Sequence, residues 1–176
     1  MSAKSDKELV EAARGGDVDG FTALCERYYP AMVAIAHAVL GDRHLAEDAA
    51  QEGFAKACQR LRQLKNGDRV AGWLAAICRN AAKDLARAGE KLRTAEDLSK
   101  LADASERDAP NEAVREAIRT LPASARELIY LRYYDGMTYE QIAAVLEISE
   151  QAINGRLRRA KKRIARTLRR SGFIEV

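Results

Sequence analysis

Proline, aromatic residues and cysteine are all scarce in this chain of 176 residues. Three residues are proline, three are cysteine and 6% are aromatic, whereas 47% are hydrophobic. Because Ala and Leu favour helices while aromatic residues favour strands, this composition predicts helices rather than sheets. No segment alternates apolar and polar residues as a strand does, so the expected fold class is all-α, with room for one or two small domains.

The few cysteines and histidines exclude most metal and redox chemistry. Cys25, Cys58 and Cys78 are far apart, form no CxxC pair, and are accompanied only by His37 and His44. No metal site or cofactor is therefore expected, and each cysteine is expected to be a small buried hydrophobe. No nucleophile, base and orienting group converge, so we expect neither an enzyme nor a small-molecule substrate.

Long apolar runs are missing as well. No run approaches the roughly 18 residues of a membrane span, and the first residues lack the apolar centre of a signal peptide. Reduced thiols fit a cytoplasmic protein, which is the expected location.

Acidic residues are absent from residues 151–170, which contain nine arginines and lysines. The formal net charge of the whole chain is only +4, so the basic charge is concentrated near one end. This distribution predicts a polyanionic partner. A basic run is more often a solvated helix face, but this one continues a helix-turn-helix pattern.

Apolar residues at steps of three and four predict helices over residues 5–14, 17–40, 44–61 and 70–87. Ser5 and Glu8 have the spacing of a capping box, and Pro30 is expected to kink or restart the second helix. The pattern places Leu45, Phe54 and Cys58 on the buried side of the third helix. The segment 64–69 is expected to be a loop.

Four more helices are expected towards the end of the chain, over residues 111–121, 125–135, 138–146 and 150–170. Ser124 is expected to cap the second of these, a capping box of Thr138 and Gln141 the third, and Ser149 the fourth. The predicted domains are residues 1–88 and 112–176, joined by a flexible linker over residues 89–111.

The last two helices have the pattern of a DNA-binding helix-turn-helix. Asn and Gln can pair with adenine in the major groove and Arg with guanine, while Lys suits phosphates. The candidate residues for DNA contact are Ser149, Gln151, Asn154, Arg156, Arg158, Arg159 and Lys162. A plain helical hairpin with a charged outer face is the alternative interpretation.

The stretch LPASARELIYLRYYDGMTYEQIAAVLEISEQAINGRLRRAKKRI (121–164) resembles the −35-binding domain of bacterial sigma factors of the extracytoplasmic-function (ECF) group. Similar modules occur in response regulators and other activators. HLAEDAAQEGFAKACQRL (44–61) resembles the sigma segment that docks on the β′ clamp helices of RNA polymerase. That resemblance implies polymerase contact by Asp48, Gln51, Glu52 and Phe54.

RVAGWLAAICRNAAKDLAR (69–87) resembles the sigma helix that meets the −10 element, and the loop before it holds a flipped base in that family. The implied −10 contacts are Lys65, Asn66, Arg69, Arg79, Asn80, Lys83 and Arg87. The implied partners are core RNA polymerase (β′ clamp helices and β flap), promoter DNA and an anti-sigma factor. The implied function is promoter recognition, −10 melting and transcription initiation.

Two other functions remain open. A helix-turn-helix regulator that does not join polymerase would bind DNA through the second domain alone. A sigma mimic that sequesters an anti-sigma factor would show little promoter-dependent transcription.

Two residues depart from the family pattern. Glu147 stands where the turn usually carries glycine, so either this residue takes a positive φ at a cost of about 1 kcal/mol or the turn has a different shape. Gly155 lies inside the recognition helix and weakens it by about 0.5–1 kcal/mol relative to Ala. The sequence offers no reason for Gly53 and Gly72, each beside an aromatic residue.

Overall fold

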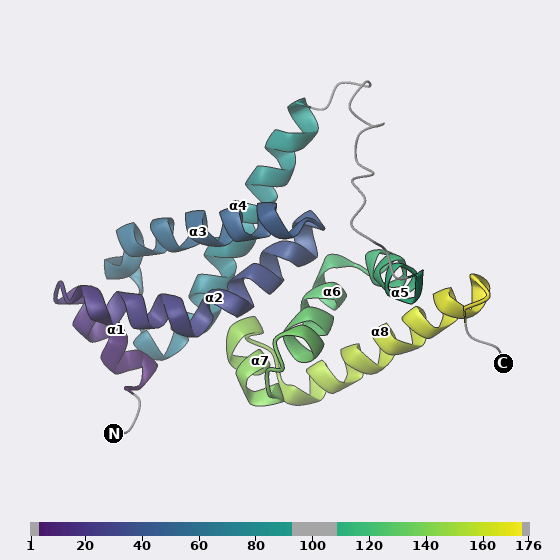
Figure 1. The fold of residues 1–176 in the computed structure, drawn as a ribbon. Coiled ribbons are helices and arrows are strands. Elements are labelled where there is room, and N and C mark those ends of the chain that lie inside the picture. The colour runs from purple at the N-terminus through teal and green to yellow at the C-terminus, as the bar shows by residue number, and fades with distance from the viewer. Residues whose placement is uncertain (1–3, 93–108, 174–176) are drawn as a thin grey trace.

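The structure is a computed structural model that describes residues 4–92 and 109–173, and every regular element in those ranges is helical (Figure 1). The first half contains α1 (Asp6–Arg14), α2 (Val18–Leu40), α3 (Arg43–Arg60), the 3-10 turns η1 (Leu61–Gln63) and η2 (Gly67–Arg69), and α4 (Val70–Leu92). The second half contains α5 (Ala109–Arg119), α6 (Ala123–Ile129), the π-helical turn η4 (Tyr130–Tyr134), α7 (Tyr139–Leu146) and α8 (Glu150–Arg170). The all-α prediction is confirmed. Within these ranges, no helix is both long enough and apolar enough to cross a membrane.

Short-range capping signals place several helix starts as predicted. Ser5 Oγ accepts a hydrogen bond from Glu8 N at 3.3 Å, and Ser5 N donates to Glu8 Oε2 at 2.7 Å. Thr138 and Gln141 form the same reciprocal pair, at 3.2 and 2.9 Å. Ser149 Oγ accepts from Ala152 N at 3.2 Å and caps α8. Each cap satisfies a backbone donor that the helix itself leaves free.

Other boundaries differ from the prediction. Ser124 does not cap α6, because that helix begins at Ala123 after Pro122, which offers no side-chain cap. A second helix does not start at Pro30, since α2 runs from Val18 to Leu40 with this proline inside it. Helix extends into both ends of the predicted linker 89–111, because α4 continues to Leu92 and α5 begins at Ala109. Its central part lies outside the described residues.

Small side chains bring α2, α3 and α4 together in the first half. The buried face of α3 consists mostly of alanine and glycine. A Cβ on Gly53 would lie only 3.2 Å from Cys78 Cα, so α3 crosses α4 at a point where only glycine fits without a shift. This close approach explains Gly53.

Two residues of α3 lie on the surface although the apolar pattern places them in the core. Cys58 is exposed, and Leu45 is 44% exposed. Both follow the same i, i+3, i+4 periodicity as buried neighbours, but four alanines with Gly53 and Phe54 already form the buried face of α3. Of the other cysteines, Cys78 is buried and Cys25 half-buried. Burial raises the pKa of Cys78 to about 12 and that of Cys25 to about 11, so neither is an activated thiol.

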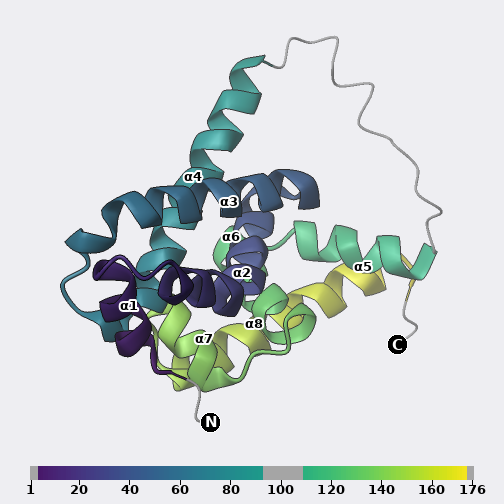
Figure 2. The ribbon, with the colours of Figure 1, turned by 60° about the vertical axis from the view of Figure 1, so that its left-hand side comes forward.

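In the second half, α6, α7 and α8 pack around a core that includes Leu128, Ile142, Ile153 and Leu157 (Figure 2). The turn between α7 and α8 contains Glu147, whose φ of 53° and ψ of 42° lie in the left-handed region. Both features are those of a helix-turn-helix, in which a tight turn sets the second helix across the first.

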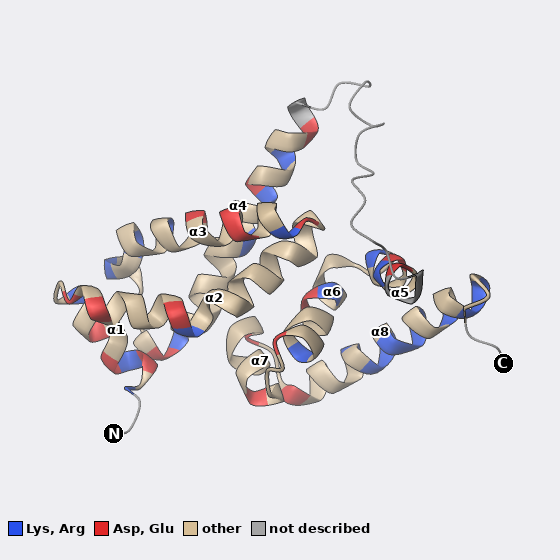
Figure 3. Ribbon diagram, viewed as in Figure 1, with Lys and Arg blue, Asp and Glu red and all other residues tan. Residues whose placement is uncertain are grey.

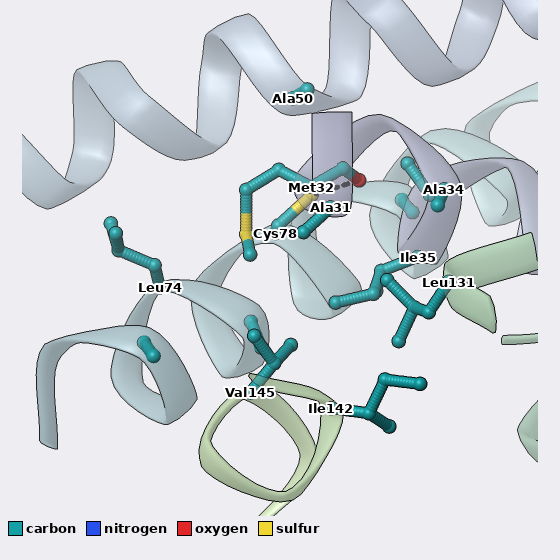
Figure 4. Close-up of a cluster of buried hydrophobic side chains, with 14 of the residues drawn as sticks. Ala31, Met32, Ala34, Ile35, Ala50, Leu74, Cys78, Leu131, Ile142 and Val145 are labelled. Atoms are coloured by element: carbon teal, nitrogen blue, oxygen red, sulfur yellow. Dashed lines mark hydrogen bonds between the residues drawn. The ribbon is translucent and has the colours of Figure 1, made fainter. Parts of the chain in front are cut away.

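The two halves share one hydrophobic core (Figure 4). Ile142 and Val145 of α7 and Leu131 of η4 face Ile35 of α2 and Leu74 of α4, and all five are at most 3% exposed. In the described ranges, then, α7 packs against α4, and α6 with η4 packs against α2. The surfaces between the halves are therefore part of the protein's interior in this structure.

Candidate nucleic-acid and protein-binding surfaces

The recognition helix α8 presents a polar outer face opposite its buried residues. Gln151, Asn154 and Arg158 are exposed and follow one another at helical steps of three and four. These three side chains can reach base edges together. Ser149 is exposed too, but its hydroxyl already accepts a hydrogen bond as the N-cap of α8. Its first role is therefore to stabilise the helix rather than to contact DNA.

Two arginines of the predicted −35 set lie elsewhere on α8. Three and four residues separate Arg156, Arg159 and Arg163, which puts them on the flank towards α5. With other basic residues of α8 this flank lines a cleft of about 640 Å³ against Thr120; the lining residues are Thr120, Arg159, Lys162, Arg163, Arg166, Thr167 and Arg170. Figure 3 shows the cationic colouring continuing along α8. Such a flank suits phosphates rather than bases.

The acidic face of α3 forms as the spacing predicts. Asp48, Gln51 and Glu52 are all exposed on one side of the helix, and Glu52 forms an ion pair with Lys56 at 3.3 Å. Phe54 points the other way: it is 8% exposed and its ring stacks on Tyr29, with centroids 6.4 Å apart. The geometry makes Phe54 a support for the helix rather than part of the outer face.

Leu45 belongs to the same outer face and was missed as a candidate. It lies one turn before Asp48 and is 44% exposed, a large apolar side chain beside two carboxylates. The apolar periodicity of α3 places this leucine in the core. Its exposure could have been predicted only from the fact that smaller side chains already fill the contact of α3 with α2 and α4.

The predicted −10 residues fall into two groups. Lys65, Asn66, Asn80, Lys83 and Arg87 are exposed. The Asn66 side chain accepts a hydrogen bond from Asp68 N at 3.0 Å and so shapes the loop before α4. Lys83 and Arg87 lie one turn apart on α4, where Arg87 is 3.6 Å from Asp84.

The remaining two, Arg69 and Arg79, are held by the other half of the chain. Arg79 Nε donates to Glu127 Oε1 at 2.8 Å and Arg79 Nη2 to Glu127 Oε2 at 3.3 Å. Arg69 Nε donates to Glu147 Oε1 at 2.9 Å. Neither pairing is visible in the sequence, because 48 and 78 residues separate the partners.

A second cavity of about 760 Å³ lies at the seam between the halves, beside His37, Tyr130 and Asp135. Burial lowers the pKa of His37, whose ring stacks on Tyr130. Burial also raises the pKa of Asp135 to about 6, and its Oδ2 is buried without a hydrogen-bond partner. Among the described residues, no three His, Cys, Asp or Glu side chains are grouped to hold a metal ion.

Comparison with protein families identifies both halves. The family model "Sigma-70 region 2" matches residues 24–91, and "Sigma-70, region 4" matches residues 111–164. The chain belongs to the sigma-70 family. Several curated relatives of the chain are named ECF RNA polymerase sigma factors. The chain belongs to this ECF group.

Two relatives illustrate the similarity. The probable RNA polymerase sigma factor RfaY of Xanthomonas campestris is 31% identical over 96% of this chain and 45% of its own length. The RNA polymerase sigma-H factor of Pseudomonas aeruginosa is 29% identical, over 96% of both chains. The chain therefore spans less than half of the first relative and nearly all of the second.

Among solved structures, the chain resembles CnrH, determined in complex with the cytosolic domain of CnrY. The sequence identity is 27% and the TM-score 0.64, and the match covers 94% of this chain and 97% of CnrH. The helical arrangement over most of the chain is thus that of a known fold.

Proposed function

We propose that this protein is an ECF sigma factor, which joins core RNA polymerase, directs it to promoters and starts transcription. The observation that carries the proposal is the presence of a region 2 match and a region 4 match, in that order, in one chain. A regulator that acts without polymerase requires only the second. Residues 1–88 and 112–176 are its proposed domains, with residues 89–111 as the connection.

The outer face of α3 is the proposed polymerase contact. Asp48 and Glu52 are exposed carboxylates on a helix that small residues anchor firmly to α2 and α4. Carboxylates pair well with arginines, which bind them in a bidentate way. Leu45 adds an apolar anchor next to these charges, the combination typical of a protein interface. The partner surface we expect is the β′ clamp helices.

The loop before α4 and the exposed polar residues of that helix are the proposed −10 contact. Lys65, Asn80, Lys83 and Arg87 are exposed and can approach the DNA backbone. Unstacking a base costs a few kcal/mol, which backbone contacts and a pocket for the base must offset. The short turn at Gly67–Arg69, shaped by Asn66, is the proposed place for that base.

The outer face of α8 is the proposed −35 contact. Gln151, Asn154 and Arg158 would read bases, each good pair discriminating by about 1–3 kcal/mol. Arg159 and Lys162, which line the basic cleft, would hold phosphates and make binding salt-dependent.

No step of this function requires chemistry on the protein itself, and its action is proposed to take place in the cytoplasm, without a cofactor. A protein partner is proposed as well, because CnrH, which shares the fold, was solved with the cytosolic domain of CnrY. For this chain we expect that partner to be an anti-sigma factor. The region 4 half is proposed to reach the β flap.

Binding to core RNA polymerase tests the proposal. Asp48→Ala with Glu52→Ala should weaken binding at least tenfold, because two exposed carboxylates are removed from the contact. The matched control is Glu11→Ala with Glu26→Ala, two exposed acids on α1 and α2. A protein that binds DNA but shows no affinity for core polymerase would be the simple regulator. Binding to polymerase without promoter-dependent transcription would favour the sigma mimic.

A further inference from the structure

The cavity of about 760 Å³ beside His37 and Tyr130 has the size and lining of a small-molecule site. Ligand pockets in proteins measure about 300–1,000 Å³ and combine an apolar wall with a few convergent polar groups. The apolar wall here comes from α2 and α5 and consists of Pro30, Val33, Ala34, Val39, Leu40 and Ile118. None of the residues that line the cavity belongs to the proposed polymerase or DNA contacts.

Aromatic side chains form another part of the lining. Tyr130 stacks on His37, with ring centroids 4.7 Å apart, and meets Tyr134 edge to face at 5.2 Å. Tyr134 is 64% exposed, and Tyr29, which also lines the cavity, is 37% exposed. Exposed aromatic rings beside a cavity offer an area on which a flat aromatic ligand can stack.

Arginines give the cavity a positive charge. The described lining residues include four arginines and a single carboxylate, that of Asp135; the arginines are Arg43, Arg115, Arg119 and Arg126. Arg126 donates to three backbone carbonyl oxygens at 2.8 to 3.0 Å, and carbonyl groups do not neutralise its charge. Arg43 and Arg119 form ion pairs with glutamates of their own helices, but such exposed pairs are weak. The cavity therefore favours an anionic group, which arginine can bind in a bidentate way.

Asp135 brings a buried carboxylate oxygen to the cavity. Its Oδ2 accepts no hydrogen bond from any residue that the structure describes. A buried acceptor without a donor costs free energy, so such atoms in native proteins usually have a partner. Burial raises the pKa of Asp135 to about 6, so the carboxylate is charged at pH 7.5 and acts as an acceptor only. A ligand that carries an N–H or O–H group would satisfy this oxygen.

We propose that this cavity binds a small aromatic anion that also carries a hydrogen-bond donor. The aromatic ring lies against Tyr130 and Tyr134, and the donor bonds to Asp135 Oδ2. The anionic group lies among the arginines. Because the lining residues come from α2 and from α5, α6 and η4, the ligand contacts both halves of the chain.

Three related fluorescent probes separate the three contacts. The first, 2-anilinonaphthalene-6-sulfonate, has the aromatic rings, the anion and an N–H donor. The second, N-phenyl-2-naphthylamine, lacks the sulfonate, and the third, 2-(N-methylanilino)naphthalene-6-sulfonate, lacks the N–H. We expect the first probe to bind the full chain saturably at one site at pH 7.5, measured by fluorescence titration. Absence of saturable binding would overturn the proposal.

Substitutions assign the charge contact to the arginines. Arg43→Gln with Arg115→Gln should weaken both sulfonates about fivefold or more and leave N-phenyl-2-naphthylamine within about twofold, because only the sulfonates are charged. The matched control, Arg60→Gln with Arg62→Gln, makes the same change in net charge at two exposed arginines outside the cavity. Equal losses in the two variants would mean that net charge alone attracts the sulfonates, and would refute the site.

The donor contact has its own test. In the wild type the N–H probe should bind about fivefold more tightly than its N-methyl analogue, as expected for one hydrogen bond. Asp135→Ala should remove this preference, and the N-methyl probe reports any change caused by the lost charge. A preference that persists in Asp135→Ala would exclude Oδ2 as the acceptor and contradict the proposed ligand class.

A side chain that fills the cavity tests its location. Val33 is half-buried on α2 and lines the cavity, so Val33→Trp should abolish saturable binding of the N–H probe. Val18→Trp makes the same substitution at a 75% exposed position of the same helix and should retain binding. Circular dichroism shows whether each variant is folded; if Val33→Trp is not, the arginine and Asp135 variants decide.

Two further outcomes would overturn the proposal. Unchanged binding to folded Val33→Trp would place the probe elsewhere. Affinity that falls as the protein concentration rises would mean that a second copy of the chain fills the cavity. None of these measurements uses polymerase or promoter DNA, so their outcome is independent of the function proposed above.

Discussion

Glu147 offers the sharpest test of the structural reasoning, because a conformational cost and an ion pair oppose each other at one residue. Its φ of 53° lies in the left-handed region, where a side chain costs about 1–2 kcal/mol. Glycine escapes that cost but loses about 0.4–1 kcal/mol through its greater freedom in the unfolded chain. The net gain for glycine over alanine is therefore about 0.5–1 kcal/mol.

The ion pair adds a smaller amount. The side chains of Arg69 and Glu147 are 66% and 48% exposed, so their pairing contributes about 0.2–1 kcal/mol. Glu147→Gly loses the pair but gains the conformational term, and should be close to the wild type in stability. Glu147→Ala loses the pair and keeps the cost, so it should be less stable than Glu147→Gly.

Thermal and urea unfolding followed by circular dichroism measure this difference. For a chain of this size we expect Glu147→Ala to unfold about 1–4 °C below Glu147→Gly. Equal slopes of the urea transitions show that the two variants expose the same surface. Alanine as stable as glycine would refute the left-handed conformation at this turn.

Three further predictions follow from local geometry. Thr138→Ala removes the capping box of α7 and should destabilise the protein by about 1 kcal/mol in urea unfolding. The control is Thr22→Ala, at an exposed threonine that caps no helix, and it should leave stability nearly unchanged. Equal losses of stability in the two variants would contradict the capping role. Gly155→Ala should stabilise by about 0.5–1 kcal/mol, since a Cβ there meets nothing closer than Arg159 Nη1 at 3.8 Å, and a loss of stability would show a contact that this space excludes. Burial raises the pKa of Asp135 from 3.8 to about 6. Its favourable contribution to the free energy of unfolding is therefore present below pH 4 and is lost as the pH rises through 6. Asp135→Asn should therefore gain stability over the wild type between pH 4 and pH 7, and a difference that does not depend on pH would contradict the raised pKa.

Features that depend on neighbours in the sequence were predictable. The caps at Ser5, Thr138 and Ser149 each require a donor within three residues, so spacing alone reveals them. The left-handed conformation of Glu147 was left open: the resemblance puts glycine at this place of the turn, but the sequence did not decide whether Glu147 takes a positive φ or the turn has another shape. The exposed acidic face of α3 follows from helical periodicity in the same way.

Features that depend on contacts between distant parts of the chain could not be predicted from the sequence. Nothing local distinguishes Arg79, which is paired with a nearly buried carboxylate, from Lys83, which is exposed. Gly53 and Gly72 are explained only by the helix or turn that approaches them. Leu45 matches the apolar periodicity of α3, yet the contact it would join is already filled, so the pattern overstates its burial.

The central claim is that this chain makes core RNA polymerase start at promoters. The most direct measurement is transcription in vitro from a pool of genomic promoter fragments, using purified bacterial core polymerase with and without the protein. We expect discrete new start sites that share two elements centred near −10 and −35, and that disappear with Asp48→Ala and Glu52→Ala but persist with Glu11→Ala and Glu26→Ala. DNA binding by the protein alone, with no new start site, would contradict the account.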